Sequence, residues 1–343
     1  MTAIFDDLAH LPHRLFSMLG VTGSWIVLIL FLINMRSWPF GWHARLFNRA
    51  FRLLLQSLWF DFTHVLQPAE QRRALKQAWW ESMSPIGVNP LDEVSVYKTW
   101  AGPDDCDYNL HLSNSSYAKS FDVARVGAAI KYFPTYVRTG GGLVVGATHF
   151  SFLREIPALS KYEVHVSIAT WDEKWLYLVA RFVTFPKNGK SKAGKRARPP
   201  PIGTVTTPLS SDAESGAHPP PAALLAALAA ESAPHNAVLH CVGIAHIVLK
   251  QGRVTVPPAL GLACEGFSGD GRTVHMQHVR EIVGKKGGLG ELRKFMRGGW
   301  REVDENKRWW EDALGGAVEE RRVKNLEVIG LVRKGLEGAR FMK

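Results

Sequence analysis

The pattern of apolar and polar positions divides the chain into four parts, and one uncharged segment dominates the first. Residues 15–35 contain no charged side chain and include the continuous apolar run WIVLILFLI at 25–33. A helix of about 20 apolar residues spans a bilayer. Four arginines between positions 36 and 52 follow the segment, whereas only Arg14 lies shortly before it. This bias predicts a single-pass anchor within residues 1–36, with the rest of the chain on the cytosolic side of a membrane such as the endoplasmic reticulum. A secretory signal peptide and a buried globular helix are the alternatives.

The second part, residues 37–91, combines large apolar and basic side chains at helical spacing. Within 46–62, LFNRAFRLLLQSLWFDF, the aromatic and leucine residues form one stripe, and basic residues lie largely between them. This pattern predicts an amphipathic helical linker that suits a bilayer surface next to an anchor. Packing of the same helix against the following domain is the alternative. Pro85 and Pro90 then interrupt the pattern, so we expect the folded domain to begin near Asp92.

The third part, residues 92–260, carries the periodicities of a mixed domain. The expected elements are a short strand at 93–100, a slim helix at 115–132, and strands at 143–153, 161–170 and 174–185, with a turn at 171–174. Small residues along the helix would let other elements cover it on several sides. A short strand, a covered helix and long antiparallel strands predict an α+β fold.

The sheet pattern is interrupted and then resumes before the fourth part. Residues 187–235 are rich in Lys, Pro, Gly and Ala, a composition that buries little apolar surface, so we expect a disordered insertion. Strand character returns at 237–256. The last part, residues 261–343, is charged and mainly helical, and predicts a C-terminal extension. Its apolar positions Val323, Leu326, Ile329 and Leu336 form a candidate docking face.

Composition narrows the classes of partner. The 343 residues carry a formal charge of +11, which suits an acidic membrane surface, a phosphorylated substrate or a nucleic acid. Six basic residues between 187 and 198 are more typical of a solvated loop, so we expect no nucleic acid partner. The three cysteines have no CxxC spacing and predict neither disulfides nor a metal cluster. The acids beside Cys106 disfavour its thiolate and hence a nucleophilic role.

The most polar stretch of the domain precedes its helix. Residues 104–117 read DDCDYNLHLSNSSY, with three acids, a histidine and an asparagine before the expected buried helix. Each buried carboxylate or amide must find a partner or cost a few kcal/mol. The stretch is therefore either a helix cap, which Asn, Ser and Asp favour, or a functional site.

The spacing of this stretch resembles that of a known family. The matching positions are Asp105, Asp107, His111, Asn114 and Tyr117, followed by Asp122 and Arg125. The pattern is similar to the signature of hot-dog proteins of the 4-hydroxybenzoyl-CoA thioesterase type, above all to the membrane-anchored thioesterase-like proteins of animals and fungi. Ser113 departs from it, because the family often has asparagine there, and so does the insertion at 187–235.

The resemblance implies a fold and an activity. We expect a curved antiparallel sheet wrapped around a central helix, and a homodimer with the active site at its interface. The implied reaction is hydrolysis of an acyl thioester carried by coenzyme A or an acyl carrier protein, with no cofactor and no metal. A membrane as a further partner would bring lipophilic acyl substrates close to the site.

The resemblance also assigns roles to residues. Asp107 occupies the position of the catalytic carboxylate, which attacks the carbonyl or activates water. Asn114 would orient the water or the carboxylate, and the backbone from Asn114 through Ser115 and Ser116 would bind the developing oxyanion at the helix N-terminus.

The other positions of the signature are expected to support the site. Asp105 would bond loop amides, and His111 would position the loop or the substrate, or be an ordinary partly buried histidine. Tyr117 is expected in the core, and Asp122 with Arg125 in an intrahelical pair.

Two other functions stay open. DYNLH at 107–111 resembles the D-x-N-P-x-H element of hot-dog hydratases, but it lacks the proline and is one residue short. A non-catalytic acyl-binding or scaffold protein would keep the fold and the anchor without turnover. The sequence contains no GxSxG, P-loop, GxGxxG or HExxH, so serine hydrolases, nucleotide-binding enzymes and zinc proteases are not indicated.

Overall fold

The domain is built around a curved antiparallel sheet. The computed structural model describes residues 20, 23–186, 236–271, 273–284 and 288–338. The strands are β1 (Val94–Trp100), β2 (Gly142–Phe152), β3 (Lys161–Trp171), β4 (Leu176–Thr184), β5 (Val238–Gln251) and β6 (Val254–Val256). Their order is β1-β3-β4-β5-β2, every pairing is antiparallel, and β6 pairs with β5. The order leaves β1 and β2 at the two edges of the sheet.

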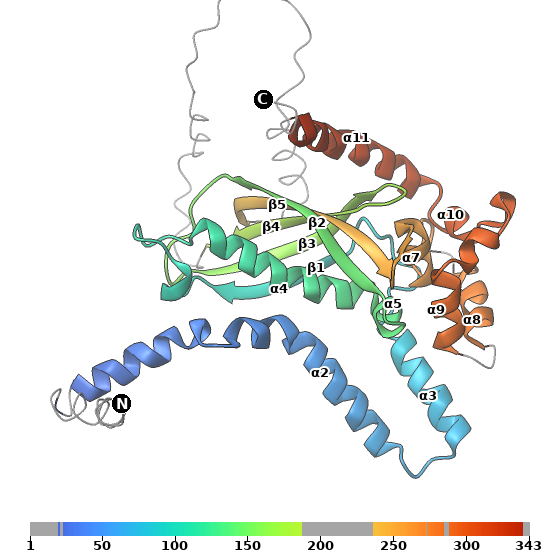
Figure 1. The fold of residues 1–343 in the computed structure, drawn as a ribbon, viewed down its shortest axis with the longest axis horizontal. Helices are drawn as coiled ribbons and strands as arrows, with labels where there is room; N and C mark the ends of the chain where they lie inside the picture. The colour runs from blue at the N-terminus through green and yellow to red at the C-terminus, as the bar shows by residue number, and fades with distance from the viewer. Residues whose placement is uncertain (1–19, 21–22, 187–235, 272, 285–287, 339–343) are drawn as a thin grey trace, which may run out of the picture.

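The sheet wraps around the long helix α4 (Asn114–Tyr132), as Figure 1 shows. Polar side chains tie the helix to β3: the Tyr132 hydroxyl donates to the Val166 carbonyl over 2.6 Å, and the hydroxyls of Ser120 and Tyr162 are 2.7 Å apart. Alanines keep the helix slim where Phe121 and Tyr117 fill the core. The predicted covered helix and curved sheet are thus confirmed, and with them the α+β hot-dog architecture.

The edge strand β2 is irregular. Its pairing with β5 shifts between Val145 and Ala147, a β-bulge that bends the strand. A Cβ added at Gly146 would lie 2.4 Å from the ring of Trp175, so only glycine fits under that indole. Several β2 side chains face solvent, and the Val144 side chain is 50% exposed.

Helices precede the domain. Residues 23–33 are helical and are followed by the 3-10 turn η1 (Asn34–Ser37), then by α2 (Gly41–Thr63) and α3 (Ala69–Glu81). Among residues 20 and 23–338 with their gaps, no helix is both long enough and apolar enough to cross a membrane. Part of the predicted anchor, residues 15–19 and 21–22, lies outside the described residues.

Helix α2 packs on the domain through its basic side. An Arg45 Nη1 lies 3.8 Å from an Asp105 carboxylate oxygen, and a Cβ at Gly127 of α4 would meet the Arg49 guanidinium at 3.5 Å. The apolar stripe of α2 is turned away from the domain and exposed. Its members are Phe47, Phe51, Leu54, Leu55, Leu58, Trp59 and Phe62. The helix therefore contacts the domain, but with its arginines and not with its apolar face.

The C-terminal helices cover one end and the outer face of the sheet (Figure 1). These C-terminal helices are α7 (Pro258–Cys264), α8 (Met276–Gly284), α9 (Leu289–Met296), η3 (Gly299–Glu302), η4 (Glu305–Lys307), α10 (Trp309–Ala313) and α11 (Ala317–Gly338). Two further short helices, η2 (Pro103–Asp105) and α5 (Pro134–Arg138), precede and follow α4. Ile329 and Leu326 of α11 pack on Tyr177 and Val179 of the sheet. The predicted docking face is confirmed at these two positions, whereas Val323 is exposed.

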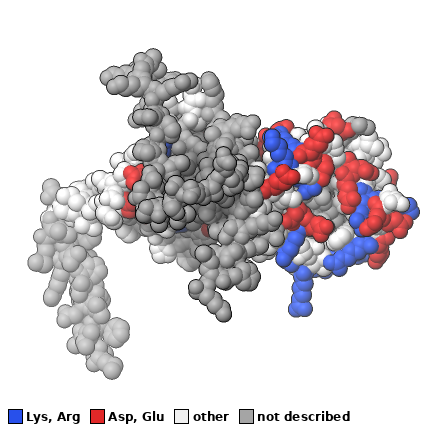
Figure 2. All heavy atoms as spheres, turned by 90° about the horizontal axis from the view of Figure 1, so that it is seen from above, with Lys and Arg blue, Asp and Glu red and all other residues white. Residues whose placement is uncertain are grey.

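Charge is mixed over this end of the molecule. Figure 2 shows basic and acidic side chains interspersed on the surface that the C-terminal helices present. Several form pairs one helical turn apart, such as Arg322 with Glu319 and Lys294 with Glu291. The predicted insertion at 187–235 lies outside the described residues.

Candidate active site

A tight loop before α4 holds Asp107. The Asp107 N–H donates to the His111 carbonyl over 2.8 Å, and the Leu110 N–H donates to the Asp107 carbonyl over 3.1 Å. Leu110 takes a left-handed conformation with φ 60° at this turn. Isolated antiparallel β-bridges pair Cys106 with Leu112 and His111 with Pro157. The loop is thereby fixed to the segment that follows β2.

The Asp107 carboxylate is oriented by the backbone of its own loop. Its Oδ1 accepts hydrogen bonds from the N–H of Asn109 over 2.9 Å and of His111 over 3.2 Å. Within the described part of the chain its Oδ2 makes no hydrogen bond. One oxygen is therefore held in place while the other is free to contact a water or a substrate.

The N-terminus of α4 has free donors. The N–H groups of Ser116 and Tyr117 donate to the Ser113 carbonyl, and no side chain of Ser113 caps the helix. In the described structure no acceptor bonds the N–H of Asn114 or of Ser115. The first N–H groups of a helix lack intrahelical partners and carry the positive end of its dipole. These two N–H groups are therefore suited to bind a negatively charged oxygen.

Asp107 and Asn114, the first residue of α4, line one cavity. Its volume is about 220 Å³. The lining residues are Asp107, His111, Leu112, Asn114, Tyr117, Phe152, Leu153, Arg154 and Glu155. The structure thus brings together four of the residues predicted from the sequence, namely Asp107, His111, Asn114 and Tyr117. The N-terminal residue of α4, the Asp107 carboxylate and apolar side chains meet there within one small space.

Three other predicted residues lie beside the cavity and do not line it. Asp105 is buried, and its carboxylate accepts a hydrogen bond from Lys119 Nζ of α4 over 3.1 Å. The loop amide of Ser113 donates to the backbone carbonyl of Asp105 and not to its carboxylate. Ser116 is buried behind it, with its hydroxyl 2.9 Å from that of Ser113. Ser115 is exposed.

His111 and Tyr117 have different surroundings within the cavity. His111 Nδ1 lies 3.4 Å from a carboxylate oxygen of Glu155, which is 74% exposed. Tyr117 is buried between the rings of Phe152 and Phe182, at 5.1 and 5.0 Å, and burial raises the pKa of its phenol. The Tyr117 hydroxyl therefore stays protonated, and its ring belongs to the core as predicted.

The remaining sequence predictions concern residues outside the cavity. Asp122 and Arg125 form an ion pair one turn apart on α4, as expected. Burial, followed by the charges of Asp105, Asp107 and Asp104, raises the pKa of the Cys106 thiol. That direction agrees with the expected lack of a thiolate.

Sequence reasoning missed Arg154 and Glu155. They follow β2 and reach the cavity because Leu112 N–H donates to the Ile156 carbonyl over 2.8 Å, which joins the two loops. The only signal in the sequence is a pair of opposite charges directly after a strand and before Pro157. Arg154 places a positive charge at the edge of the cavity.

The part of the chain that contains the Asp107 loop is similar to known proteins. Residues 101–228 match the profile of the thioesterase-like superfamily. The chain carries a thioesterase-like domain. The matched segment contains the Asp107 loop, α4 and strands β2 to β4, and β5 lies beyond its end.

Curated relatives of the thioesterase-like domain come from fungi and animals. Thioesterase lcsJ of Purpureocillium lilacinum is 28% identical over 50% of this chain and 63% of its own. Probable thioesterase atnL of Emericella nidulans is 29% identical over 48% of this chain and 54% of its own. Protein THEM6 of Danio rerio is 34% identical over 31% of this chain and 54% of its own. The chain thus spans between about half and two thirds of the length of these relatives.

Proposed function

We propose that the thioesterase-like domain hydrolyses an acyl thioester of coenzyme A or an acyl carrier protein, at a membrane surface and as a homodimer. One observation carries the proposal: Asp107 and Asn114, the first residue of α4 and one of the two with a free N–H, line the same cavity. A thioester carbonyl needs both a group that delivers the attacking oxygen and donors for the oxyanion that develops.

The reaction follows from these positions. The carbonyl oxygen of the thioester accepts hydrogen bonds from the N–H of Asn114 and Ser115, which polarises the carbonyl carbon. Asp107 Oδ2 then either takes a proton from an attacking water or attacks the carbon itself, in which case water hydrolyses the resulting anhydride. The C–S bond breaks, the sulfur takes a proton, and the products are a carboxylic acid and a thiol. Asn114 orients the water.

The contacts of His111 favour hydrolysis over hydration. Asp107 bonds the backbone N–H of His111, whereas the imidazole faces Glu155. A hydratase mechanism with an Asp107 and His111 side-chain dyad lacks support from this arrangement. The His111 ring is better placed to hold the loop that follows β2.

The exposed edge of β2 supports a homodimer. On the outer side of β2, the described structure places no further strand. An exposed, long edge strand is a template for pairing with another chain. Phe152 at the end of β2 lines the cavity, so a second copy paired along β2 would lie next to it.

Exposed apolar side chains support attachment to a membrane. The side chains of Trp25 and of all residues to Ile33 are exposed, and so is the apolar stripe of α2. Exposed apolar surface of this extent marks a site of contact with a membrane or another protein. The uncharged span at 15–35 and the arginines after it favour the membrane, with the domain on the cytosolic side.

A panel of acyl-CoA substrates tests the proposal. Purified protein is incubated with short, long and aromatic acyl-CoAs while free thiol is measured. We expect thiol release with at least one acyl group. Loss of enoyl absorbance without thiol release would instead indicate a hydratase, and saturable acyl binding without either reaction would indicate a binding protein.

A further inference from the structure

A second cavity lies at the opposite end of α4 from the candidate active site. It is bounded by α3, α5, α7 and α8 and has a volume of about 300 Å³. Helix α4 has 19 residues and is about 28 Å long at about 1.5 Å per residue, so the two cavities lie far apart. The two cavities share no lining residue. The size is at the lower end of that of ligand-binding pockets, about 300 to 1,000 Å³.

The inner surface of this cavity is apolar. Trp80 of α3, Cys264 of α7 and Met276 and Val279 of α8 supply it, and Val283 and Leu289 extend it. Cys264, Met276 and Val279 are also part of the main core. The cavity thus reaches down to tightly packed side chains. Such a surface favours a slender hydrocarbon chain over a polar ligand or a helix.

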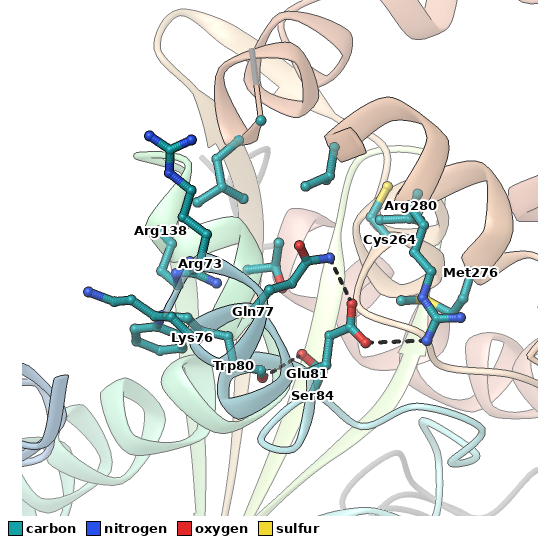
Figure 3. Close-up of a pocket in the computed structure, with 15 residues that line it drawn as sticks. Arg73, Lys76, Gln77, Trp80, Glu81, Ser84, Arg138, Cys264, Met276 and Arg280 are labelled. Atoms are coloured by element: carbon teal, nitrogen blue, oxygen red, sulfur yellow. Dashed lines mark hydrogen bonds and ion pairs between the residues drawn. The ribbon is translucent and has the colours of Figure 1, made fainter. Parts of the chain in front are cut away.

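Basic side chains surround the apolar surface. Figure 3 shows Arg73, Lys76 and Arg138 on the same side, around Trp80, with Arg280 across the cavity. Two of the four are neutralised by carboxylates: Lys76 pairs with Asp61, and Arg280 lies 3.2 Å from a Glu81 oxygen. In the described structure Arg73 and Arg138 have no carboxylate within ion-pair distance.

Arg138 stacks on Trp80, and the described structure places no carboxylate within ion-pair distance of it. Its guanidinium carbon lies 4.0 Å from the centroid of the Trp80 ring, which holds the cation against the apolar wall. Burial lowers its pKa to about 10, so the group stays charged at neutral pH. A charged guanidinium that is held on an aromatic ring and has no carboxylate within ion-pair distance is a strong binding group for a carboxylate or a phosphate.

We propose that this cavity binds a single-chain amphiphile with an anionic headgroup. The chain lies against Trp80, Met276 and Val279, and the headgroup lies between Arg73 and Arg138. A free fatty acid and a phosphorylated single-chain lipid share this chemistry. The site goes beyond thioester hydrolysis and does not depend on it, since no residue of the candidate active site takes part.

Ligands of one chain length but different headgroups test the proposal. Full-length protein is titrated by calorimetry with decanoate, decyl phosphate and decanol below their micelle-forming concentrations. We expect decanoate, decyl phosphate or both to bind at least about tenfold more tightly than decanol, because charged hydrogen bonds contribute about 1.5–3 kcal/mol. Binding of the phosphate alone would identify a phosphorylated lipid as the ligand, and binding of decanoate would identify a fatty acid.

Variants locate the binding. Arg73→Gln with Arg138→Gln should weaken binding of the anionic ligands about tenfold or more and leave decanol unchanged. The control removes two arginines outside the cavity, Arg72→Gln with Arg301→Gln, and should retain affinity. Asp107→Asn should also retain affinity for the anionic ligands, since that side chain lines the other cavity. Thiol release by the Arg73 and Arg138 variant should equal that of the parent. Equal affinity for decanol and decanoate, no binding at all, or unchanged affinity in the Arg73 and Arg138 variant would overturn the proposal.

Discussion

At the scale of single residues, the most unusual carboxyl group is that of Glu265. It is fully buried, and its two oxygens accept hydrogen bonds from the N–H of Thr135 and of Tyr136 over 3.0 and 2.5 Å. It thereby joins the end of α7 to the start of α5. Burial raises its pKa from 4.5 to about 7, although these bonds and the nearby charge of Arg138 oppose that shift.

This raised pKa predicts a pH-dependent stability. Between about pH 4.5 and 7 the folded chain keeps the Glu265 proton that the unfolded chain loses, so the free energy of unfolding falls as the pH rises. Above that window the free energy of unfolding is lower by about 3 kcal/mol, because each unit of pKa shift corresponds to about 1.36 kcal/mol. Urea titrations of the parent and Glu265→Gln at several pH values measure it. The parent should lose stability relative to the variant across this range, and a constant difference between them would contradict the assignment.

The sequence predicted four of the nine residues that line the cavity, because these four lie in one motif. Asp107 and Asn114 lie in one continuous motif whose spacing indicates a loop before a helix. Arg154 and Glu155 come from the far end of β2, and only the hydrogen bond between two loops brings them to the site. Similarly, the pattern marked Asp105 as a loop anchor, but its carboxylate bonds α4 and α2 because it is buried between them.

At the scale of elements, strand β2 decides how two copies would meet. If its exposed edge pairs with a second copy, a lysine at Val144 should weaken the dimer, because the charge would be placed in an apolar interface. Analytical ultracentrifugation of the parent should give a dimer, and Val144→Lys should shift it toward the monomer. Val323→Lys, on the exposed side of α11, is the control. A parent that stays monomeric at all concentrations would contradict the pairing.

The elements that the sequence predicted are those with strong local periodicity. Strands expected at 161–170 and 174–185 are observed at Lys161–Trp171 and Leu176–Thr184, and the turn between them is held by Asp172, which accepts from the N–H of Lys174 and Trp175. Helix α3 and the helices α7 to α10 lie largely in parts of the chain that the sequence predicted as helical without individual bounds. Their positions depend on long-range contacts such as that of Arg280 with Glu81.

The arrangement of α2 also depended on tertiary contacts. An amphipathic pattern gives the face of a helix but not the partner of that face. Arg45 and Arg49 lie on the domain because Asp105 and the bare surface of Gly127 accommodate them. The apolar stripe is consequently left facing outward.

At the scale of the whole molecule, the exposed apolar surface of the N-terminal helices predicts attachment to a membrane. Alkaline carbonate extraction of cells that express the full chain should leave it in the pellet with a known integral membrane protein. A variant with Leu28→Arg and Leu30→Arg should move to the supernatant, because each charge at the centre of a span costs about 3 kcal/mol. Release of the parent chain by carbonate would show that residues 15–35 are not an anchor.

The central claim for the whole molecule is that the loop before α4 is an active site and not merely a helix cap. Asn has nearly the shape of Asp and can keep the hydrogen bonds that Asp107 accepts from Asn109 and His111. It is neither a nucleophile nor a useful base near neutral pH. Asp122→Asn makes the same chemical change on α4 outside the cavity, where it removes only the pair with Arg125. The two variants therefore separate catalysis from fold stability.

The most direct test measures the rate of thiol release by folded parent, Asp107→Asn and Asp122→Asn, with whichever acyl-CoA the parent hydrolyses. We predict that Asp107→Asn loses on the order of a hundredfold or more of the turnover, whereas Asp122→Asn loses only a small part. Asn114→Ala should fall between them, because it removes positioning and not the reacting group. If Asp107→Asn hydrolyses the substrate as fast as the parent, Asp107 only holds the loop, and the proposed mechanism is wrong.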